Sequence, residues 1–221
     1  MKTVIFDLDG TLADTSGDLI DAANACFAGL DLPPQLQYGA DDALAVRGAR
    51  AMLREGFRRL GRTKVETEVD RLFPAFIGHY AAQLDKHSYM YDGAVQAVEM
   101  LKSNGYKVGI CTNKPHAQAE VLLKQLGVRD IFGSMIAADT IAWRKPDPRP
   151  LFEAIHRAGG DPRRAVLVGD TVTDRETARN AKLPCILVTF SPQGHAVSDL
   201  DPEALLHDYK DLGALVQQVI G

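Results

Sequence analysis

Five short apolar runs constrain the fold of this chain more than any other feature. They are near-continuous in Val, Ile, Leu and Ala, which is typical of strands buried on both faces of a parallel sheet. The runs span residues 3–8, 107–112, 134–138, 165–169 and 185–189. Helical patterns of apolar residues lie between the later runs. The alternation of strand and helix predicts right-handed βαβ units, and therefore an α/β fold with a doubly wound, Rossmann-like parallel sheet of five strands.

The first run is separated from the others by a long insertion. About 98 residues lie between Leu8 and Lys107, and their apolar residues recur at three- and four-residue steps, as in α-helices. Leu19, Ala23 and Phe27 belong to one such stripe. The pattern predicts a small all-helical cap at residues 15–85, inserted into a core formed by residues 1–14 and 86–221.

Composition and charge exclude several classes of protein. The 221 residues are 46% hydrophobic and 24% charged, which is ordinary globular usage, and the net charge of −4 lacks the basic footprint of a nucleic-acid-binding protein. No apolar run reaches the roughly 18 residues of a membrane helix. Asp7 interrupts the first run too early for a secretory leader. The three cysteines are too widely spaced for a disulfide framework or a CxxC metal site. We therefore expect a cytoplasmic monomer or homodimer without nucleic-acid or membrane partners.

Polar side chains follow four of the five predicted strands. In a parallel sheet the ligand site lies beyond the carboxyl ends of the strands, so these side chains are expected to meet there. The residues are Asp7, Asp9, Thr112, Asn113, Lys145, Asp170 and Asp174. Four carboxylates in one place repel each other unless a cation lies among them. Oxygen ligands without nearby His or Cys suit Mg²⁺ better than Zn²⁺, so the pattern predicts a magnesium site.

The same residue types suit phosphate chemistry. The four negative charges exceed the charge of one Mg²⁺ and of Lys145, so one carboxylate is expected to hold a proton and to serve as a general acid. A metal ion, the ammonium of Lys145, the hydroxyl of Thr112 and backbone amides after Gly10 would together hold a phosphate. A carboxylate can then act as the nucleophile by forming an aspartyl-phosphate.

The sequences around these residues resemble the four motifs of the haloacid dehalogenase-like superfamily. They read Phe-Asp-Leu-Asp-Gly-Thr-Leu-Ala-Asp-Thr from Phe6, Thr-Asn-Lys-Pro from Thr112, Arg-Lys-Pro-Asp-Pro from Arg144, and Gly-Asp-Thr-Val-Thr-Asp from Gly169. The resemblance covers essentially the whole chain, because the helical insertion occupies the position of that superfamily's type-1 cap. Within the superfamily the chain is most similar to the phosphoglycolate phosphatase-like branch, with Tyr-Asp-Gly from Tyr91 where that branch has Tyr-Pro-Gly.

The resemblance implies a role for each core residue. Asp7 is expected to be the nucleophile and Asp9 the acid/base, which argues against the dehalogenase branch because that branch lacks the second acid. Thr112, Asn113 and Lys145 are expected to bind the substrate's phosphoryl group. The implied activity is hydrolysis of a small cytosolic phosphomonoester, such as phosphoglycolate, through an aspartyl-phosphate.

The resemblance also implies how Mg²⁺ is held. The carboxylates of Asp7 and Asp170 and the backbone carbonyl of Asp9 are expected to bind the metal ion. Asp174 is expected to support the metal's water shell. All four residues come from the ends of the first and fourth predicted strands.

The cap departs from the pattern of the branch. Branch members tend to carry Gly-x-Gly near the second cap helix, whereas here Val46 stands in place of the first glycine, two residues before Gly48. Arg47 and Arg50 flank Gly48, and an arginine is the side chain best shaped to bind a carboxylate. Both are predicted cap residues for the substrate. The alternative is that both are solvent-facing or salt-bridged within the cap.

Other functions remain open at this point. A phosphosugar mutase or a sugar-phosphate phosphatase has the same fold, and the mutase returns the phosphoryl group to its substrate. A phospho-acceptor signalling module also combines Asp, Thr and Lys around Mg²⁺. Such modules are about half as long as this chain, and a cap over the site would hinder docking of a phosphodonor protein. A cap fits a small substrate better, because its closure excludes bulk water.

Overall fold

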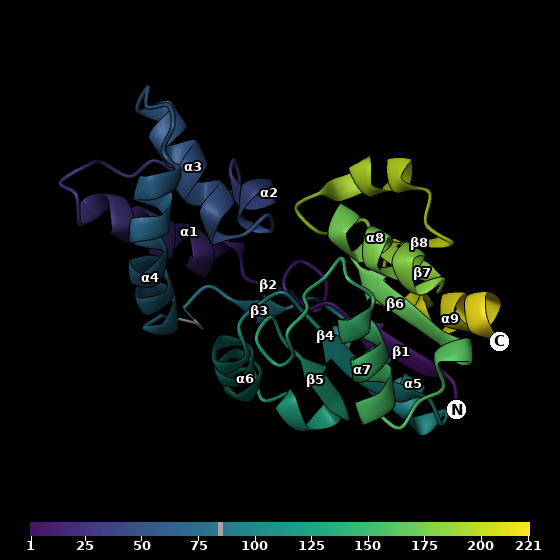
Figure 1. The fold of residues 1–221 in the computed structure, drawn as a ribbon. Helices are drawn as coiled ribbons and strands as arrows, with labels where there is room; N and C mark the ends of the chain where they lie inside the picture. Colours follow the sequence, from purple (N-terminus) through teal and green to yellow (C-terminus); the bar gives the residue numbers. More distant parts are fainter. Residues whose placement is uncertain (84–85) are drawn as a thin grey trace. The chain divides into compact units, whose positions relative to one another are not determined.

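The computed structural model describes residues 1–83 and 86–221 (Figure 1). Within this described part the main sheet has six strands, in the order β5-β4-β1-β6-β7-β8, and all neighbouring pairs are parallel. The strands are β1 (Thr3–Phe6), β4 (Lys107–Cys111), β5 (Ser134–Ile136), β6 (Ala165–Gly169), β7 (Cys185–Val188) and β8 (Ala204–Leu206). The predicted α/β fold with a doubly wound parallel sheet is confirmed.

The sixth strand corrects the predicted number of five. β8 has three residues and pairs with β7 at the edge of the sheet, with Ile186 opposite Ala204 and Val188 opposite Leu206. Only Leu206 of these three β8 residues is buried. A strand this short, half-exposed and surrounded by turn residues lacks the apolar run by which the other five strands are recognised.

Helices cover both faces of the sheet, so β1 is buried on both of its faces. Val4 and Phe6 pack in one core cluster with residues of α5 (Ala94–Ser103), α6 (His116–Gln125) and α9 (Leu212–Ile220). Ile5 points to the opposite face, where it packs with residues of α7 (Arg149–Arg157) and α8 (Val172–Ala181). Short 3-10 helices cover Arg129–Ile131, Pro162–Arg164, Gly194–Leu200 and Tyr209–Asp211. This two-sided burial explains why the strands read as apolar runs.

The chain forms two compact units. The first comprises Met1–Ala13 and Met90–Gly221, and the second comprises Asp14–Tyr89. A two-stranded sheet of β2 (Ala13–Asp14) and β3 (Tyr89–Met90) contains both points at which the chain passes from one unit to the other. The predicted cap ends at residue 85, which lies outside the described residues.

The second unit is helical and has a hydrophobic core of its own. Its helices are α1 (Ser16–Ala28), α2 (Asp42–Ala45), α3 (Ala49–Arg59) and α4 (Glu66–Ala81). The rings of Phe27 and Phe57 meet edge to face at 5.4 Å between centroids. Gly56 permits this packing of α3 on α1, because a Cβ at that position would lie 2.2 Å from the ring of Phe27. An aromatic core of this kind stabilises the short helices, which would be marginal alone.

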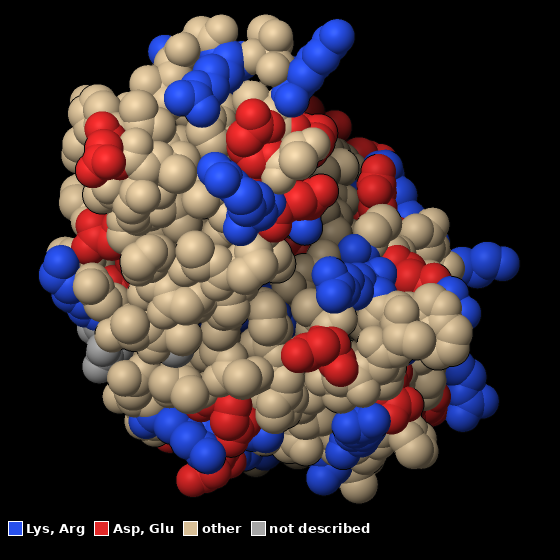
Figure 2. Space-filling view, turned by 60° about the vertical axis from the view of Figure 1, so that its left-hand side comes forward, with Lys and Arg blue, Asp and Glu red and all other residues tan. Residues whose placement is uncertain are grey.

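Charges of both signs alternate on the surface of the second unit. Several of its basic side chains pair with acidic neighbours, as Arg54 does with Glu66 and Arg58 does with Glu55. On the face drawn in Figure 2, Lys and Arg side chains are interspersed with Asp and Glu. Over the part of the chain that the structure describes, the face drawn in Figure 2 shows no one-sided basic patch of the kind typical of nucleic-acid binding. Among the described residues, no helix is both long and apolar enough to cross a membrane.

Candidate active site

The carboxyl ends of β1, β4 and β6 lie at one edge of the sheet. Phe6 is in register with Ile110 of β4 and with Val168 of β6, so the residues that follow emerge side by side. Asp7 continues the pairing one step beyond β1, because its N–H donates to the carbonyl of Val168 at 2.9 Å. The N–H of Leu8 donates to Asp7 Oδ1 at 2.7 Å. Hydrogen bonds therefore hold both the backbone and the carboxylate of Asp7 in place.

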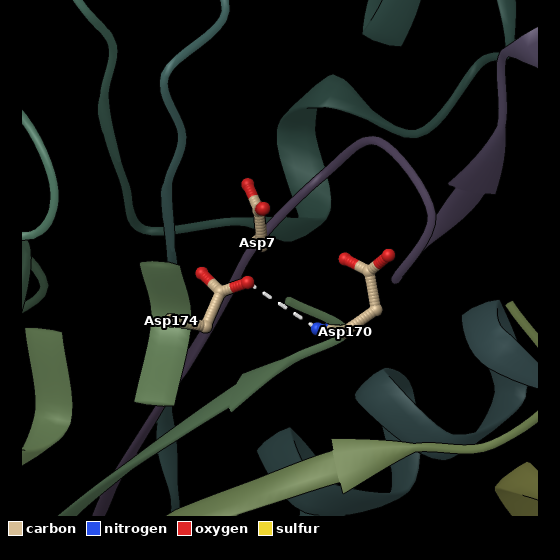
Figure 3. A group of neighbouring side chains, drawn as sticks. All are labelled: Asp7, Asp170 and Asp174. Carbon is tan, nitrogen blue, oxygen red and sulfur yellow. Dashed lines mark hydrogen bonds between the residues drawn. The ribbon is translucent and has the colours of Figure 1, made fainter. Parts of the chain in front are cut away.

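Asp170 reaches the same place from the turn between β6 and α8, and Asp174 reaches it from the first turn of α8 (Figure 3). Thr171 and Asp174 form a capping box at the start of α8, in which the N–H and hydroxyl of Thr171 donate to Asp174 Oδ2 at 3.1 and 2.7 Å. The N–H of Asp170 also donates to this oxygen, at 3.3 Å. Gly169 makes room for Asp174, because a Cβ at residue 169 would lie 2.4 Å from Asp174 Cγ.

Lys145 supplies the positive charge of the cluster. Its Nζ lies 2.6 Å from Asp174 Oδ1 and 2.9 Å from Asp7 Oδ2, and its side chain is 2% exposed. Asn113 fixes the backbone of this lysine, because the Lys145 N–H donates to Asn113 Oδ1 at 3.1 Å and Asn113 Nδ2 donates to the Lys145 carbonyl at 3.0 Å. Asn113 was predicted to bind phosphate, and in the structure both ends of its amide hold Lys145.

The cluster has the features of a magnesium site. Asp7, Asp170 and Asp174 each offer one carboxylate oxygen, and these three oxygens lie within 4.8 Å of one another. Asp170 Oδ1 accepts a hydrogen bond from the Thr11 hydroxyl at 3.0 Å. Asp170 Oδ2 is buried and has no hydrogen-bond partner among the described residues. A buried carboxylate oxygen in that state is costly without a cation, and an all-oxygen donor set suits Mg²⁺. The residues present therefore fit the predicted metal.

Burial and crowding raise the pKa of two of these carboxyl groups. Burial is the largest cause of the rise in the pKa of Asp7 to about 6. The positive charge of Lys145 offsets this rise only in part, and the negative charge of Asp174 adds to the rise. The pKa of Asp170 lies well above its usual range, first through burial and then through the charges of Asp174 and Asp7. Burial alone would lower the pKa of Lys145, but the two carboxylates outweigh it and raise the pKa. A cation at the site would favour the ionised carboxylates.

The metal-free protein is expected to lose stability as pH rises from about 4 to about 6. Over this range the unfolded chain has ionised Asp7, whereas the folded chain still holds its proton, so the folded state binds more protons and a higher pH favours unfolding. The raised pKa of Asp170 acts in the same direction. Mg²⁺ replaces these protons, so its stabilising effect is expected to grow as pH rises.

Thermal unfolding in a chelator and in Mg²⁺, measured across this pH range, checks the prediction. The matched variant is Asp7→Asn, which removes the titration of Asp7 together with the effect of its charge on the pKa of Asp170. The difference in Tm between wild type and variant measures the contribution of Asp7, including this effect on Asp170. A difference that stays constant, or that favours the wild type as pH rises, would contradict the assigned direction.

The remaining predicted core residues lie at the same edge of the sheet. Thr112 follows β4 and is buried, and its Oγ1 accepts a hydrogen bond from the N–H of Lys114 at 3.1 Å. The carboxylate of Asp9 pairs with Lys114, whose Nζ donates to Asp9 Oδ1 at 2.7 Å. The structure thus brings Asp7, Asp170 and Lys145 into one cluster with Asp174, while Asp9 contacts a different lysine.

Sequence reasoning missed three residues that support the site at this edge of the sheet. Lys114 and Thr11 both lie inside recognised motifs, so the signal was present, but neither was assigned a role. Tyr209 carries no such signal. Its buried hydroxyl donates to the carbonyl of Thr11 at 2.7 Å, across 198 residues of sequence. Tyr209 holds the backbone of the residue whose hydroxyl orients Asp170.

The two cap arginines differ in their surroundings within the second unit. Arg50 forms an ion pair with Asp70, and its guanidinium lies 4.6 Å from the ring centroid of Phe73. Arg47 is exposed in the turn between α2 and α3. Arg50 is therefore engaged by its own helical unit, and Arg47 presents its side chain to solvent.

Comparisons with known proteins identify the family. The family model for haloacid dehalogenase-like hydrolases matches residues 4–188. The phosphoglycolate phosphatase of Agrobacterium fabrum is 37% identical over 94% of this chain and 89% of its own length, and that of Mesorhizobium japonicum is 36% identical over 95% and 92%.

Solved structures share the fold. CbbY from Rhodobacter sphaeroides, in complex with phosphate, has a TM-score of 0.78 at 23% identity and covers 98% of this chain and 99% of its own. A protein from Lactobacillus delbrueckii has a TM-score of 0.87 at 22% identity, covering 100% of this chain and 98% of its own. The chain belongs to the haloacid dehalogenase-like hydrolase family, as its four motifs predicted, and its relatives at 36–37% identity are phosphoglycolate phosphatases.

Proposed function

We propose that this chain is a Mg²⁺-dependent phosphatase that hydrolyses phosphoglycolate, or a closely similar small phosphomonoester, through an aspartyl-phosphate on Asp7. The observation that carries the proposal is the buried cluster of Asp7, Asp170, Asp174 and Lys145 at the carboxyl edge of the sheet. The phosphoglycolate phosphatases among its relatives support the class of enzyme, a phosphoric monoester hydrolase. A cytoplasmic location and a monomeric or homodimeric state stay predictions.

The proposed reaction has two steps. A carboxylate oxygen of Asp7 attacks phosphorus, the bond from phosphorus to the ester oxygen breaks, and Asp9 gives a proton to that leaving oxygen. Water then attacks phosphorus and loses a proton to Asp9, which releases inorganic phosphate and restores the carboxylate of Asp7. Lys145 Nζ lies 2.9 Å from Asp7 Oδ2. In the proposal, this ammonium and the hydroxyl of Thr112 bind the phosphoryl oxygens.

Mg²⁺, when bound, would supply positive charge that offsets the charge of the phosphoryl oxygens. In the proposal it is held by Asp7 and Asp170, together with the backbone carbonyl of Asp9. Asp174 Oδ1 accepts a hydrogen bond from Lys145 Nζ, and Asp174 Oδ2 accepts one from the Thr171 hydroxyl. These hydrogen bonds support a role for Asp174 outside the set of direct metal ligands. In the proposal, it positions Lys145 and supports the water shell of the metal.

The proposal makes a specific prediction for Asp9→Asn. Asparagine cannot donate the proton that an alkoxide leaving group needs, whereas nitrophenolate leaves with little help. We expect the variant to lose about 10²-fold or more of its kcat on an alkyl phosphate, and much less on nitrophenyl phosphate. Steady-state kinetics on both substrates measure the two losses. Equal losses would show that Asp9 is not the acid.

In the proposal, the cap binds the leaving group of the substrate, which is the part that does not contain the phosphate. Arg47 remains the stronger of the two predicted cap residues, because Arg50 is engaged by Asp70 and Phe73. The guanidinium of Arg47 would bind a substrate carboxylate through two parallel hydrogen bonds.

A metabolite panel tests the proposed function. Release of inorganic phosphate from phosphoglycolate, with a kcat/KM well above that for sugar phosphates, is the expected result. An isomerised sugar phosphate without phosphate release would indicate a mutase instead. A long-lived aspartyl-phosphate without turnover would indicate a phospho-acceptor module.

A further inference from the structure

Tyr209 is a buried residue of the first unit that lies against the turn after β1. It belongs to the short helix Tyr209–Asp211, and it is 2% exposed. Its ring packs against the ring of Phe190, with 5.3 Å between the centroids. Gly93 lies so close that a Cβ at residue 93 would be 3.2 Å from Tyr209 Cβ. Two other segments therefore fix the position of this ring, and with it the position of its hydroxyl.

The hydroxyl of Tyr209 binds the backbone of this turn. It donates to the carbonyl of Thr11 at 2.7 Å, and Thr11 is fully buried. Burial, and then the charge of Asp170, raise the pKa of Tyr209, so its hydroxyl keeps the proton that it donates. Loss of this donor would deprive a buried carbonyl of a hydrogen bond, and the turn is then expected to shift.

The turn that Tyr209 holds carries two groups of the proposed metal site. It is tight, because the N–H groups of residues 11–13 all donate to the carbonyl of Leu8, at 3.3, 3.0 and 3.1 Å. The backbone carbonyl of Asp9, a proposed metal ligand, lies within it. The hydroxyl of Thr11 extends from it and donates to Asp170 Oδ1 at 3.0 Å. A shift of the turn would therefore move both groups.

Asp170 depends on the Thr11 hydroxyl for its orientation. Its Oδ1 accepts the hydrogen bond from Thr11, whereas its buried Oδ2 has no hydrogen-bond partner in the described ranges 1–83 and 86–221. The Thr11 hydroxyl thus engages one oxygen and leaves the other for the metal. Hydrogen bonds that orient a metal ligand contribute to metal affinity nearly as the ligands themselves do.

We propose that Tyr209 is a positioning residue for the Mg²⁺ site, and that it acts by holding the turn from which Thr11 orients Asp170. The inference rests on the proposed function, because the metal site of that proposal is the site that Tyr209 would position. It deepens the proposal by assigning part of the affinity for Mg²⁺ to a residue beyond β8 that supplies no metal ligand.

The Kd for Mg²⁺, measured by isothermal titration calorimetry, tests the inference without turnover. Tyr209→Phe removes the hydroxyl and keeps the ring, and we expect its Kd to rise about threefold to tenfold. Thr11→Val loses the direct partner of Asp170, so its Kd is expected to rise about tenfold to a hundredfold. Thr11→Ser keeps a hydroxyl and is expected to restore most of the affinity. Equal losses in Thr11→Ser and Thr11→Val would overturn the role of this hydroxyl, and the inference with it.

Tyr106→Phe is the matched control. The hydroxyl of Tyr106 donates to Gln217 Oε1 at 3.0 Å, directly before β4, at the opposite end of that strand from the proposed site. The control removes a tyrosine hydroxyl and its hydrogen bond from the same unit. It is expected to bind Mg²⁺ with the Kd of the wild type, and a rise equal to that of Tyr209→Phe would overturn the inference.

A purely structural role for Tyr209 would give a different result. Tyr209→Phe would then have a lower Tm, but its Kd for Mg²⁺ and the rise in Tm that Mg²⁺ causes would equal those of the wild type, which overturns the inference. The double variant Tyr209→Phe with Thr11→Val tests the route. Its Kd is expected to lie within about twofold of that of Thr11→Val, because the two residues act in series. Losses that multiply would mean that Tyr209 acts by another route, which also overturns the inference.

Folding and metal binding are controlled separately. Circular dichroism and Tm are measured for each variant, because a buried carbonyl without its donor destabilises a fold. If Tyr209→Phe does not fold, Phe190→Leu replaces it, since this variant removes the ring that packs on Tyr209 and keeps the hydroxyl. Its Kd is expected to rise, and an unchanged Kd would overturn the inference. A wild type that binds no Mg²⁺ would refute the metal site of the proposed function and the inference with it. A wild type that binds Mg²⁺, with an unchanged Kd in Tyr209→Phe, would refute the inference alone.

Discussion

Asp7→Asn is expected to abolish turnover while leaving the fold intact. Asparagine has the shape of aspartate, but its amide is a poor nucleophile and a weaker ligand for a hard cation, so both the covalent step and the metal site lose their main group. Asp7 is buried and its pKa is raised, so loss of its charge does not cost the metal-free fold a stabilising ion. We expect kcat to fall by about 10⁴-fold or more, the scale seen when a nucleophile is removed.

The measurement is kcat on the best substrate of the panel, together with circular dichroism and Tm. Asp161→Asn is a matched control, because Asp161 caps the short helix Pro162–Arg164 before β6, at the opposite end of that strand from Asp170. This control is expected to keep wild-type kcat. Wild-type turnover by Asp7→Asn would rule out Asp7 as the nucleophile.

Removal of the metal is expected to have the second large effect. The carboxylates of Asp7, Asp170 and Asp174 face one another within 4.8 Å, and Lys145 is the cation that contacts two of them. Excess chelator is expected to lower kcat by about 10²-fold or more, and added Mg²⁺ to restore it. Ca²⁺ takes more ligands at longer distances, so it is not expected to restore activity even where it binds.

Binding can be followed without turnover. Mg²⁺ is expected to raise Tm in the wild type and to raise it less in Asp170→Asn, because that variant lacks the charge of the carboxylate whose Oδ2 is buried without a hydrogen-bond partner among the described residues. Full activity after complete removal of divalent ions would contradict the metal assignment. Equal Mg²⁺ stabilisation of wild type and variant would remove Asp170 from the metal site.

The fold class and the family can be predicted from the sequence alone, because apolar runs indicate the strands and short motifs indicate the family. A strand buried on both faces is apolar at most of its positions, so β1, β4, β5, β6 and β7 are visible as runs. The motifs follow these runs directly, so Asp7 and Asp170 can be assigned to the carboxyl edge of the sheet without coordinates. β8 escaped prediction because a short, half-exposed edge strand carries no such run.

Only the tertiary structure decided which charged groups contact one another. Asp9 and Lys114 are 105 residues apart in sequence, and Thr11 and Asp170 are 159 apart. A motif states which side chains are present at a strand end, but their pairing depends on strand order, register and the paths of the turns. The sequence therefore determined the kind of site this protein has. Folding decided that Lys145 contacts Asp7 and Asp174, that Asn113 holds Lys145 and that Lys114 contacts Asp9, because a hydrogen bond depends on distances that only the assembled sheet defines.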